Sequence, residues 1–360
     1  MKNRIIGLDI LRIMAMLGII GLHIIIQGGV LKNTNIYSIK YIPILLLMII
    51  FYISINIFGL LSGYLNAEKK VYKNSRIVEL IFIMIFWSFL ITFLSYKLNI
   101  FNIQSKGLLE FIKNLFPTIA GNYWYITYYI FLFFMIPYMN EYINNISRQK
   151  YKKMLIILFV LLSIIPNLLG YIDIFKINFG YSPFWLIYCY LIGAYIKKYN
   201  VKTEKPILKL IVVVMLALTI NYTIRILGLT IFKRMVRDRW MIDYISPLNL
   251  YSSVLLLLIF KEHKKNYKAF SKVFIYLSNM TFSVYIIHCH RIIYYNIINN
   301  AHILYKNYNT ILTIIFIILT LTIIYVICCI IDEIRILVFK IFKINNFINY
   351  IGKKLDKLLN

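Results

Sequence analysis

The feature that most restricts the fold of this chain is a succession of long apolar stretches separated by short polar segments. A helix needs about 20 apolar residues to cross the hydrocarbon core of a bilayer. Ten stretches come near this length, at about 7–30, 42–65, 77–96, 122–141, 154–172, 181–196, 207–228, 244–260, 273–294 and 309–331. The pattern predicts an all-α, polytopic integral membrane protein with about ten transmembrane helices.

Composition agrees with this class, because 61% of the 360 residues are hydrophobic and only 15% are charged. A soluble domain of this length has a far lower apolar fraction. The first stretch is not a signal peptide by its pattern, since it is long, carries Asp9 and Arg12, and has no small-residue cleavage site.

The formal net charge of +27 would indicate nucleic acid as a partner in a soluble protein, but here the cations lie between the apolar stretches. If the N-terminus is inside, the inner segments hold 26 Lys and Arg and the outer segments hold 11. Positive residues collect on the cytoplasmic side of membrane proteins. We therefore expect no nucleic-acid partner, both termini in the cytoplasm, and a multi-pass location in the plasma membrane.

The first apolar stretch carries three polar residues on one helical face: Asp9, Arg12 and His23. Arg12 and His23 are about three turns and roughly 16 Å apart along a helix, and Asp9 precedes Arg12 by three residues. Ionisable groups inside a membrane usually face a polar interior and serve a function. Alternatively, Asp9 and Arg12 neutralise each other at the cytoplasmic interface and His23 is a hydrogen-bonded core residue.

A second polar group lies late in the chain, in the sequence LSNMTFSVYIIHCHRII. Tyr285 and His288 share a helical face, and an outward-running helix would place His288 near the depth of His23. We predict that Tyr285 and His288 bind the acceptor, where His288 would orient the acceptor or His23. His23 itself, as a neutral imidazole, can remove a proton from a hydroxyl group and return it. The alternative is that these side chains form hydrogen bonds that hold helices together.

Two basic segments and one aromatic segment are candidate substrate contacts. The cytoplasmic residues Lys69, Lys70, Lys73 and Arg76 either bind the phosphates of a donor or only set the topology. The outer sequence KRMVRDR, with Arg234 and Arg237, either faces an anionic acceptor or is neutralised by nearby aspartates. Trp124 and Tyr125 either stack on a sugar ring or belong to an interfacial aromatic belt.

Several kinds of chemistry have no sequence pattern in this chain. There is no G-x-S-x-G turn and no Walker A sequence. The four cysteines lie inside apolar stretches without metal-ligand spacing, so we expect neither a disulfide framework nor a metal site.

The first helix, with Gly-Leu-Asp-x-x-Arg and a His eleven residues after the Arg, resembles the opening helix of membrane-bound acyltransferase family 3. FGLLSGYL, NYWYITYYIFLFFMIPY and TFSVYIIH are similar to later family segments in the same order. The resemblance implies an acyltransferase-3-like transmembrane domain over residues 1–340, followed by a basic cytoplasmic tail at 341–360. It also implies that Arg12 and His23 are the essential pair, and we add Asp9 to the predicted catalytic group.

This resemblance further implies transfer of an acyl group, commonly acetyl, from a cytoplasmic donor such as acetyl-CoA to a carbohydrate hydroxyl outside the membrane. No bound cofactor is expected. The acceptor would be a polysaccharide or a lipid-linked glycan, and a separate extracytoplasmic partner could perform a second transfer. A transporter or flippase for a lipid-linked glycan is the alternative, because intramembrane charges and an outer basic patch suit that function too.

Overall fold

The computed structural model describes residues 4–69, 73–99, 108–118, 120–121, 123–170, 172–236, 238–263, 270–299 and 301–359, and every regular element in them is helical. The first half contains α1 (Ile6–Ile26), α2 (Tyr41–Tyr52), α3 (Ser54–Asn66), α4 (Ser75–Leu98), α5 (Leu108–Leu115), α6 (Trp124–Asn145), α7 (Arg148–Phe159), η1 (Val160–Ile164) and α8 (Ile165–Leu169). The second half contains η2 (Asn178–Gly180), α9 (Pro183–Lys198), α10 (Pro206–Phe232), α11 (Pro247–Lys261), α12 (Ser271–His288), α13 (Arg291–Ile293), η3 (Tyr294–Ile298), α14 (Ala301–Tyr305), α15 (Thr310–Ile341) and α16 (Ile344–Leu359).

Six helical segments of the described chain are long and apolar enough to cross a membrane, which makes this a multi-pass membrane protein. They are Ile6–Ile26, Tyr41–Asn66, Ser75–Leu98, Arg148–Leu169, Pro206–Phe232 and Thr310–Ile341. The predicted number of ten spans is not confirmed. The other four predicted stretches also form helices, namely α6, α9, α11 and α12. Two of these are short, since α9 has 16 residues and α11 has 15. The other two, α6 and α12, are less apolar because they contain Tyr, Asn or Ser.

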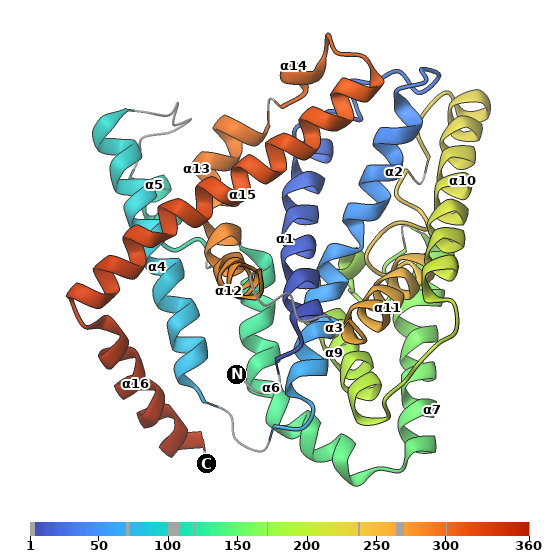
Figure 1. Cartoon of the computed structure of the whole chain (residues 1–360). Coiled ribbons are helices and arrows are strands. Elements are labelled where there is room, and N and C mark those ends of the chain that lie inside the picture. The colour runs from blue at the N-terminus through green and yellow to red at the C-terminus, as the bar shows by residue number, and fades with distance from the viewer. Residues whose placement is uncertain are drawn as a thin grey trace.

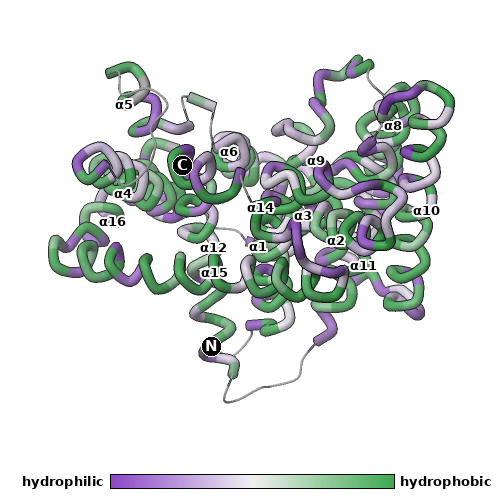
Figure 2. Tube along the Cα trace, turned by 90° about the horizontal axis from the view of Figure 1, so that it is seen from above, coloured by the Kyte–Doolittle hydropathy of each residue, from purple (hydrophilic) through white to green (hydrophobic). Residues whose placement is uncertain are grey.

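The outer faces of the peripheral helices are apolar, as expected for surfaces in contact with lipid. Large side chains such as Phe89 on α4, Ile211 on α10 and Ile330 on α15 are about half exposed or more. Figure 2 shows hydrophobic residues along most of these helices and hydrophilic ones mainly in the connections. Exposed apolar surface on this scale is unusual in a soluble monomer and marks a membrane-facing surface.

Helix α1 lies in the interior of the bundle, where it packs against α2, α3, α11, α12 and α15 (Figure 1). Most of its side chains are buried, and Leu11, Ile20, Ile24 and Ile25 are fully inaccessible. An interior position brings the polar side chains of α1 against protein instead of lipid, which is where charged groups inside a membrane are tolerated.

Helices α3 and α9 pack closely against each other, and small residues permit it. A Cβ atom on Gly63 would lie 1.9 Å from the carbonyl oxygen of Tyr190, and one on Gly193 would lie 2.0 Å from that of Leu60. Glycine at positions 63 and 193 therefore allows the two helix backbones to approach closely. Beside this contact, the buried Asn56 donates to the carbonyl oxygen of Tyr244 and accepts from the indole of Trp185, at 2.8 Å each.

The predicted basic tail contains a regular element, α16, which follows directly after α15. Its Asp356 carboxylate accepts hydrogen bonds from the backbone and side-chain nitrogens of Asn74, at 2.9 and 2.8 Å. A Cβ atom on Gly352 would lie 2.6 Å from Ser75. The two chain ends lie in the lower half of the view in Figure 1, and their cytoplasmic location stays a prediction.

Candidate active site

Helices α1 and α12 contact each other at two levels, and residue numbers rise in the same direction along both. At the first level, the hydroxyl of Ser278 donates to Asp9 Oδ1 at 2.8 Å and accepts from Arg12 Nη1 at 3.0 Å. At the second level, His23 on α1 lies beside His288 and Cys289 at the end of α12. The polar face predicted for the first helix thus meets the late polar segment at both of its ends.

Asp9 has its closest ion pair with a residue that the sequence did not single out. Arg4 Nε and Nη2 donate to the two carboxylate oxygens of Asp9 at 2.7 Å each, whereas Arg12 Nη1 lies 3.7 Å from Oδ1. Arg4 also donates to Asn279 at 3.2 Å. The expected Asp9–Arg12 pair is therefore secondary, because Arg4 matches the carboxylate with two parallel hydrogen bonds.

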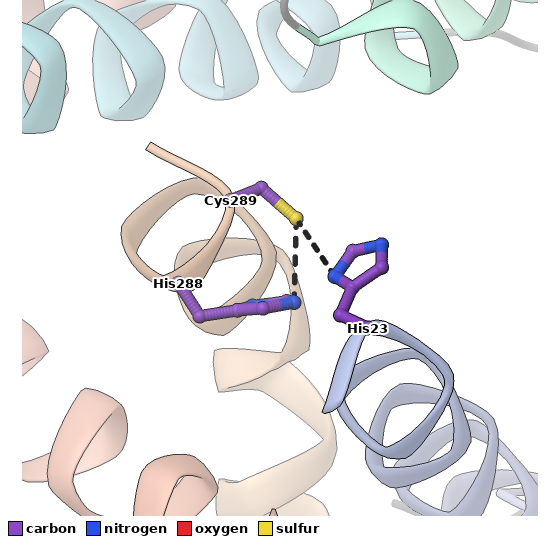
Figure 3. Close-up of side chains that lie close together, drawn as sticks. All are labelled: His23, His288 and Cys289. Carbon is purple, nitrogen blue, oxygen red and sulfur yellow. Dashed lines mark hydrogen bonds between the residues drawn. The ribbon is translucent and has the colours of Figure 1, made fainter. Parts of the chain in front are cut away.

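At the other level, two imidazoles and one thiol form a compact cluster (Figure 3). The ring centroids of His23 and His288 are 5.4 Å apart. Cys289 Sγ lies 3.3 Å from His288 Nε2 and 3.8 Å from His23 Nδ1. His23 lies in the last turn of α1, and Cys289 follows the last residue of α12, so both helix ends present these groups to the same space.

The hydrogen bond to Val284 assigns the tautomer of His288. His288 Nδ1 lies 2.6 Å from the carbonyl oxygen of Val284, which only accepts, so Nδ1 carries the proton. In a neutral ring, His288 Nε2 is then an acceptor for the thiol of Cys289. The sulfur in turn faces His23 Nδ1, and a proton on that nitrogen leaves His23 Nε2 as a free base.

These three residues are also the one group in the described chain whose donor atoms are arranged closely enough to bind a metal ion, within 4.8 Å of one another. The group has no recognisable sequence pattern, because His23 and Cys289 are 266 positions apart. The expectation that the protein binds no metal stays a prediction. A bound ion would occupy the nitrogen lone pairs that acid–base chemistry requires.

The four predicted aromatic and imidazole contacts of the acceptor join this cluster through successive ring contacts. The ring centroid of Tyr285 lies 6.3 Å from that of His288 and 6.3 Å from that of Tyr125. The ring centroids of Tyr125 and Trp124 are 5.6 Å apart. The structure therefore brings Trp124, Tyr125, Tyr285 and His288 together with His23. Their predicted role in acceptor binding stays a proposal.

Three further tyrosines line this region, and the sequence analysis did not single them out. The ring of Tyr294 meets His23 edge-on at 5.3 Å, and Tyr294 begins the π-helical segment η3. π-Helical segments often occur at functional sites. The ring centroid of Tyr181 lies 4.6 Å from that of Trp124 and 5.2 Å from that of Tyr244. With 31 tyrosines in the chain, composition alone could not separate these from the others.

In the basic segment 233–239, which is predicted to lie outside, Arg239 makes aromatic and charged contacts although it was not among the predicted arginines. Arg234 is exposed, and among the described residues it makes no contact with Trp124, Tyr125 or Tyr285. Arg237 lies outside the described residues. Arg239 instead lies over the ring of Phe179 and 3.9 Å from Asp243. Burial raises the pKa of Asp243 to about 7, against the opposing effect of Arg239.

That segment is held in place by α10. Arg225, which is 5% exposed, donates to the hydroxyl of Tyr41 at 2.8 Å, to Asn221 Oδ1 at 2.8 Å and to the carbonyl oxygen of Asp238. Asn221 Nδ2 donates to the carbonyl oxygens of Asp238 and Trp240, at 3.1 and 2.9 Å. A buried guanidinium with several acceptors fixes the backbone next to Arg239.

Three of the four predicted cytoplasmic cations are described, and Lys70 lies outside the described residues. Lys73 and Arg76 are exposed, and Lys69 is half-buried with its ammonium group donating to Asn66 at 2.7 Å. Burial lowers the pKa of Lys69, and the positive charges of Arg76 and Arg12 lower it further. Lys69, Arg76 and Arg12 are thus near enough to interact at the same end of α1.

Comparison with known proteins fits this arrangement. A family model described as an acyltransferase domain, that of acyltransferase family 3, matches residues 5–331. No curated protein and no solved structure matches the chain. The matched range holds both levels of the α1–α12 contact and all the aromatic residues beside His23. The chain therefore belongs to acyltransferase family 3, as its opening helix indicates, and it is an acyltransferase.

Proposed function

We propose that this protein transfers an acyl group, with acetyl as the preferred candidate, from a cytoplasmic acyl-CoA to a hydroxyl of an extracytoplasmic polysaccharide or lipid-linked glycan. The observation that carries the proposal is the position of His23, at the end of α1 opposite Arg12 and beside His288 and Tyr294. The plasma membrane is the proposed location, since the reaction moves an acyl group from a cytoplasmic donor to a polymer at the cell surface.

His23 acts as the general base in this proposal. Its Nε2 removes the proton of the acceptor hydroxyl while the oxygen attacks the acyl carbonyl carbon, and the sulfur of the thioester leaves with that proton. A positioned imidazole contributes about 10²–10⁴-fold to such a step. The contacts from Val284 through His288 to Cys289 support the required tautomer. If the thiol donates to His288 Nε2, its sulfur is available to accept a hydrogen bond from a proton held on His23 Nδ1, which leaves His23 Nε2 as the base.

The donor is proposed to bind at the Arg12 end. Arg12, Lys69 and Arg76 place three positive charges there, and the phosphates of coenzyme A are anionic. From Arg12 to His23 is roughly 16 Å along the helix, a span that the extended arm of an acyl-CoA can follow. Lys73 and Lys70 are proposed to add to the same phosphate-binding edge.

An acceptor is proposed to approach from the opposite end, over Trp124, Tyr125 and Tyr285. Aromatic faces bind the C–H surface of sugar rings, and tyrosine hydroxyls can bond to sugar hydroxyls. Arg239, which lies over the ring of Phe179, is proposed as a cation of the acceptor site, with Arg234 and Arg237 earlier in the same segment of sequence. A separate extracytoplasmic protein could take the acyl group further and is not required for the first transfer.

The test is mass spectrometry of surface polysaccharides from cells with the gene, without it, and complemented with wild type, His23→Ala or His302→Ala. We expect an acyl-sized mass that depends on the gene and is lost with His23→Ala. His302 contacts the carbonyl oxygen of Gly28 and serves as the matched control that keeps activity.

Normal acylation with a folded His23→Ala protein would overturn the role of His23. The transporter alternative receives no support from the family to which the chain belongs. It predicts instead that deletion leaves the mass of each glycan unchanged and causes lipid-linked intermediates to accumulate. That result would replace the proposal as a whole.

A further inference from the structure

We infer that Cys289 is a further catalytic residue and carries the acyl group as a thioester between the donor and the acceptor. This inference rests on the proposed function. It starts from the position of Cys289 Sγ between two imidazole rings, 3.3 Å from His288 Nε2 and 3.8 Å from His23 Nδ1 (Figure 3).

The three groups Cys289, His288 and Val284 have the geometry of an activated nucleophile. Such a site has a thiol within hydrogen-bond reach of a base, and a third group that orients the base. Here the carbonyl oxygen of Val284 holds His288 Nδ1–H at 2.6 Å, so Nε2 is directed at the thiol as an acceptor. A purely structural cysteine in an apolar core does not require an oriented imidazole beside it.

The position of Cys289 in the fold also suits a nucleophile. It follows the last residue of α12, at the point where the chain turns toward α13. Its side chain is partly exposed, whereas Cys189, Cys328 and Cys329 are buried. A substrate can therefore reach Cys289 more readily than any other cysteine of the chain.

The two half-reactions balance. First, the thiol of Cys289 attacks the carbonyl carbon of the donor thioester, its proton passes through His288 Nε2 to the leaving thiolate, and the free thiol of the donor departs. Second, the acceptor hydroxyl attacks the acyl carbon on Cys289, its proton passes to His23, and the sulfur of Cys289 leaves and is protonated again. Two thioester bonds are broken, one thioester and one ester are formed, and no oxidant or reductant is needed.

A carrier at this point has a physical advantage in a membrane. The donor binds at the Arg12 end and the acceptor at the outer end, so direct transfer requires both substrates in one continuous polar channel. With the acyl group on Cys289, the donor leaves before the acceptor binds, and the two ends of the path need not be open together. Such alternate release is the ping-pong pattern expected for covalent catalysis.

The test uses the full-length protein in nanodiscs, incubated with isotope-labelled acetyl-CoA and no acceptor, followed by peptide mass spectrometry. We expect one acetyl group on the peptide that contains Cys289, removable by hydroxylamine. Cys289→Ala abolishes this label, His288→Ala slows its formation, and His23→Ala keeps the label while transfer stops. Cys328→Ala is the matched control and labels normally.

In cells, Cys289→Ala is expected to lower polysaccharide acylation about 10²-fold or more, as for loss of a nucleophile. Acylation within twofold of wild type in Cys289→Ala, or a label in wild type that resides on His23 or on no residue, would overturn the carrier and leave the proposed function intact. Absence of any gene-dependent acyl group on wild-type glycans would instead remove the proposed function. The label in wild type decides the question even if the Cys289→Ala protein does not fold.

Discussion

Asp9 is bound to Arg4 by two contacts of 2.7 Å, while the guanidinium of Arg12 stays 3.7 Å from the same carboxylate. The two arginines near the start of α1 therefore make different contacts. Arg4 neutralises a carboxylate that is only 4% exposed. Arg12 contacts Ser278, and its proposed role is to bind the donor.

The first prediction concerns Asp9. Asp9→Asn removes the charge that Arg4 and Ser278 both contact, so we expect a loss of stability of about 1–3 kcal/mol, typical of a lost charge-assisted hydrogen bond. Thermal unfolding in detergent measures it, and Arg4→Gln should give a similar loss. An unchanged melting temperature for both variants would show that the pair does not stabilise the fold.

Arg12 should instead affect donor binding. Arg12→Lys keeps a positive charge but loses the planar group that can form two hydrogen bonds to a phosphate. We expect the KM for acetyl-CoA to rise about tenfold, as for loss of one charge-assisted hydrogen bond, with the KM for the acceptor unchanged. A lower kcat with an unchanged KM would place Arg12 in the chemical step instead.

Trp124 provides a test of acceptor binding. Trp124→Ala removes the ring that lies 4.6 Å from Tyr181 and 6.3 Å from Tyr244. Loss of aromatic stacking should raise the KM for the acceptor about threefold to tenfold without changing the KM for acetyl-CoA. Tyr138→Ala, at an exposed position of the same helix, is the control that changes neither value. Equal effects of both variants would argue against a sugar contact at Trp124.

Asp243 should make stability depend on pH. The pKa of Asp243 is raised from 3.8 to about 7 in the folded protein, chiefly by burial. Between these values the folded state holds a proton that the unfolded chain has lost, so the contribution of this group decreases as the pH rises from about 4 to about 7. Melting temperatures across this range should fall less steeply for Asp243→Asn than for wild type. Glu204→Gln, on an exposed loop, should behave as wild type.

The last prediction concerns metal ions. His23, His288 and Cys289 offer two nitrogens and one sulfur within 4.8 Å, a donor set that Zn²⁺ accepts. We expect added Zn²⁺ to inhibit acyl transfer reversibly, and a chelator alone to leave the activity of the purified protein unchanged. His288→Ala should weaken the inhibition as measured on its residual activity. Inactivation by the chelator alone would reveal a required metal ion.

Much of the architecture could be predicted from local pattern. Long apolar stretches indicate helices in a membrane, and each of the ten predicted stretches overlaps a helix. The number of spans could not be predicted in the same way. Whether helices such as α9 and α11 cross the bilayer depends on their packing and tilt, and a hydropathy pattern contains neither.

The sequence by itself determined that Asp9, Arg12 and His23 share one face of the first helix, because that relation depends only on the helical repeat. Tertiary structure alone decided that Asp9 binds Arg4 more closely than Arg12, and that Cys289 lies between His23 and His288. Arg4 precedes the first residue of α1, so the helical repeat does not place it beside Asp9. The position of Cys289 depends on how α1 packs against the end of α12. Residues more than 260 positions apart in the chain have no spacing from which such contacts could be inferred.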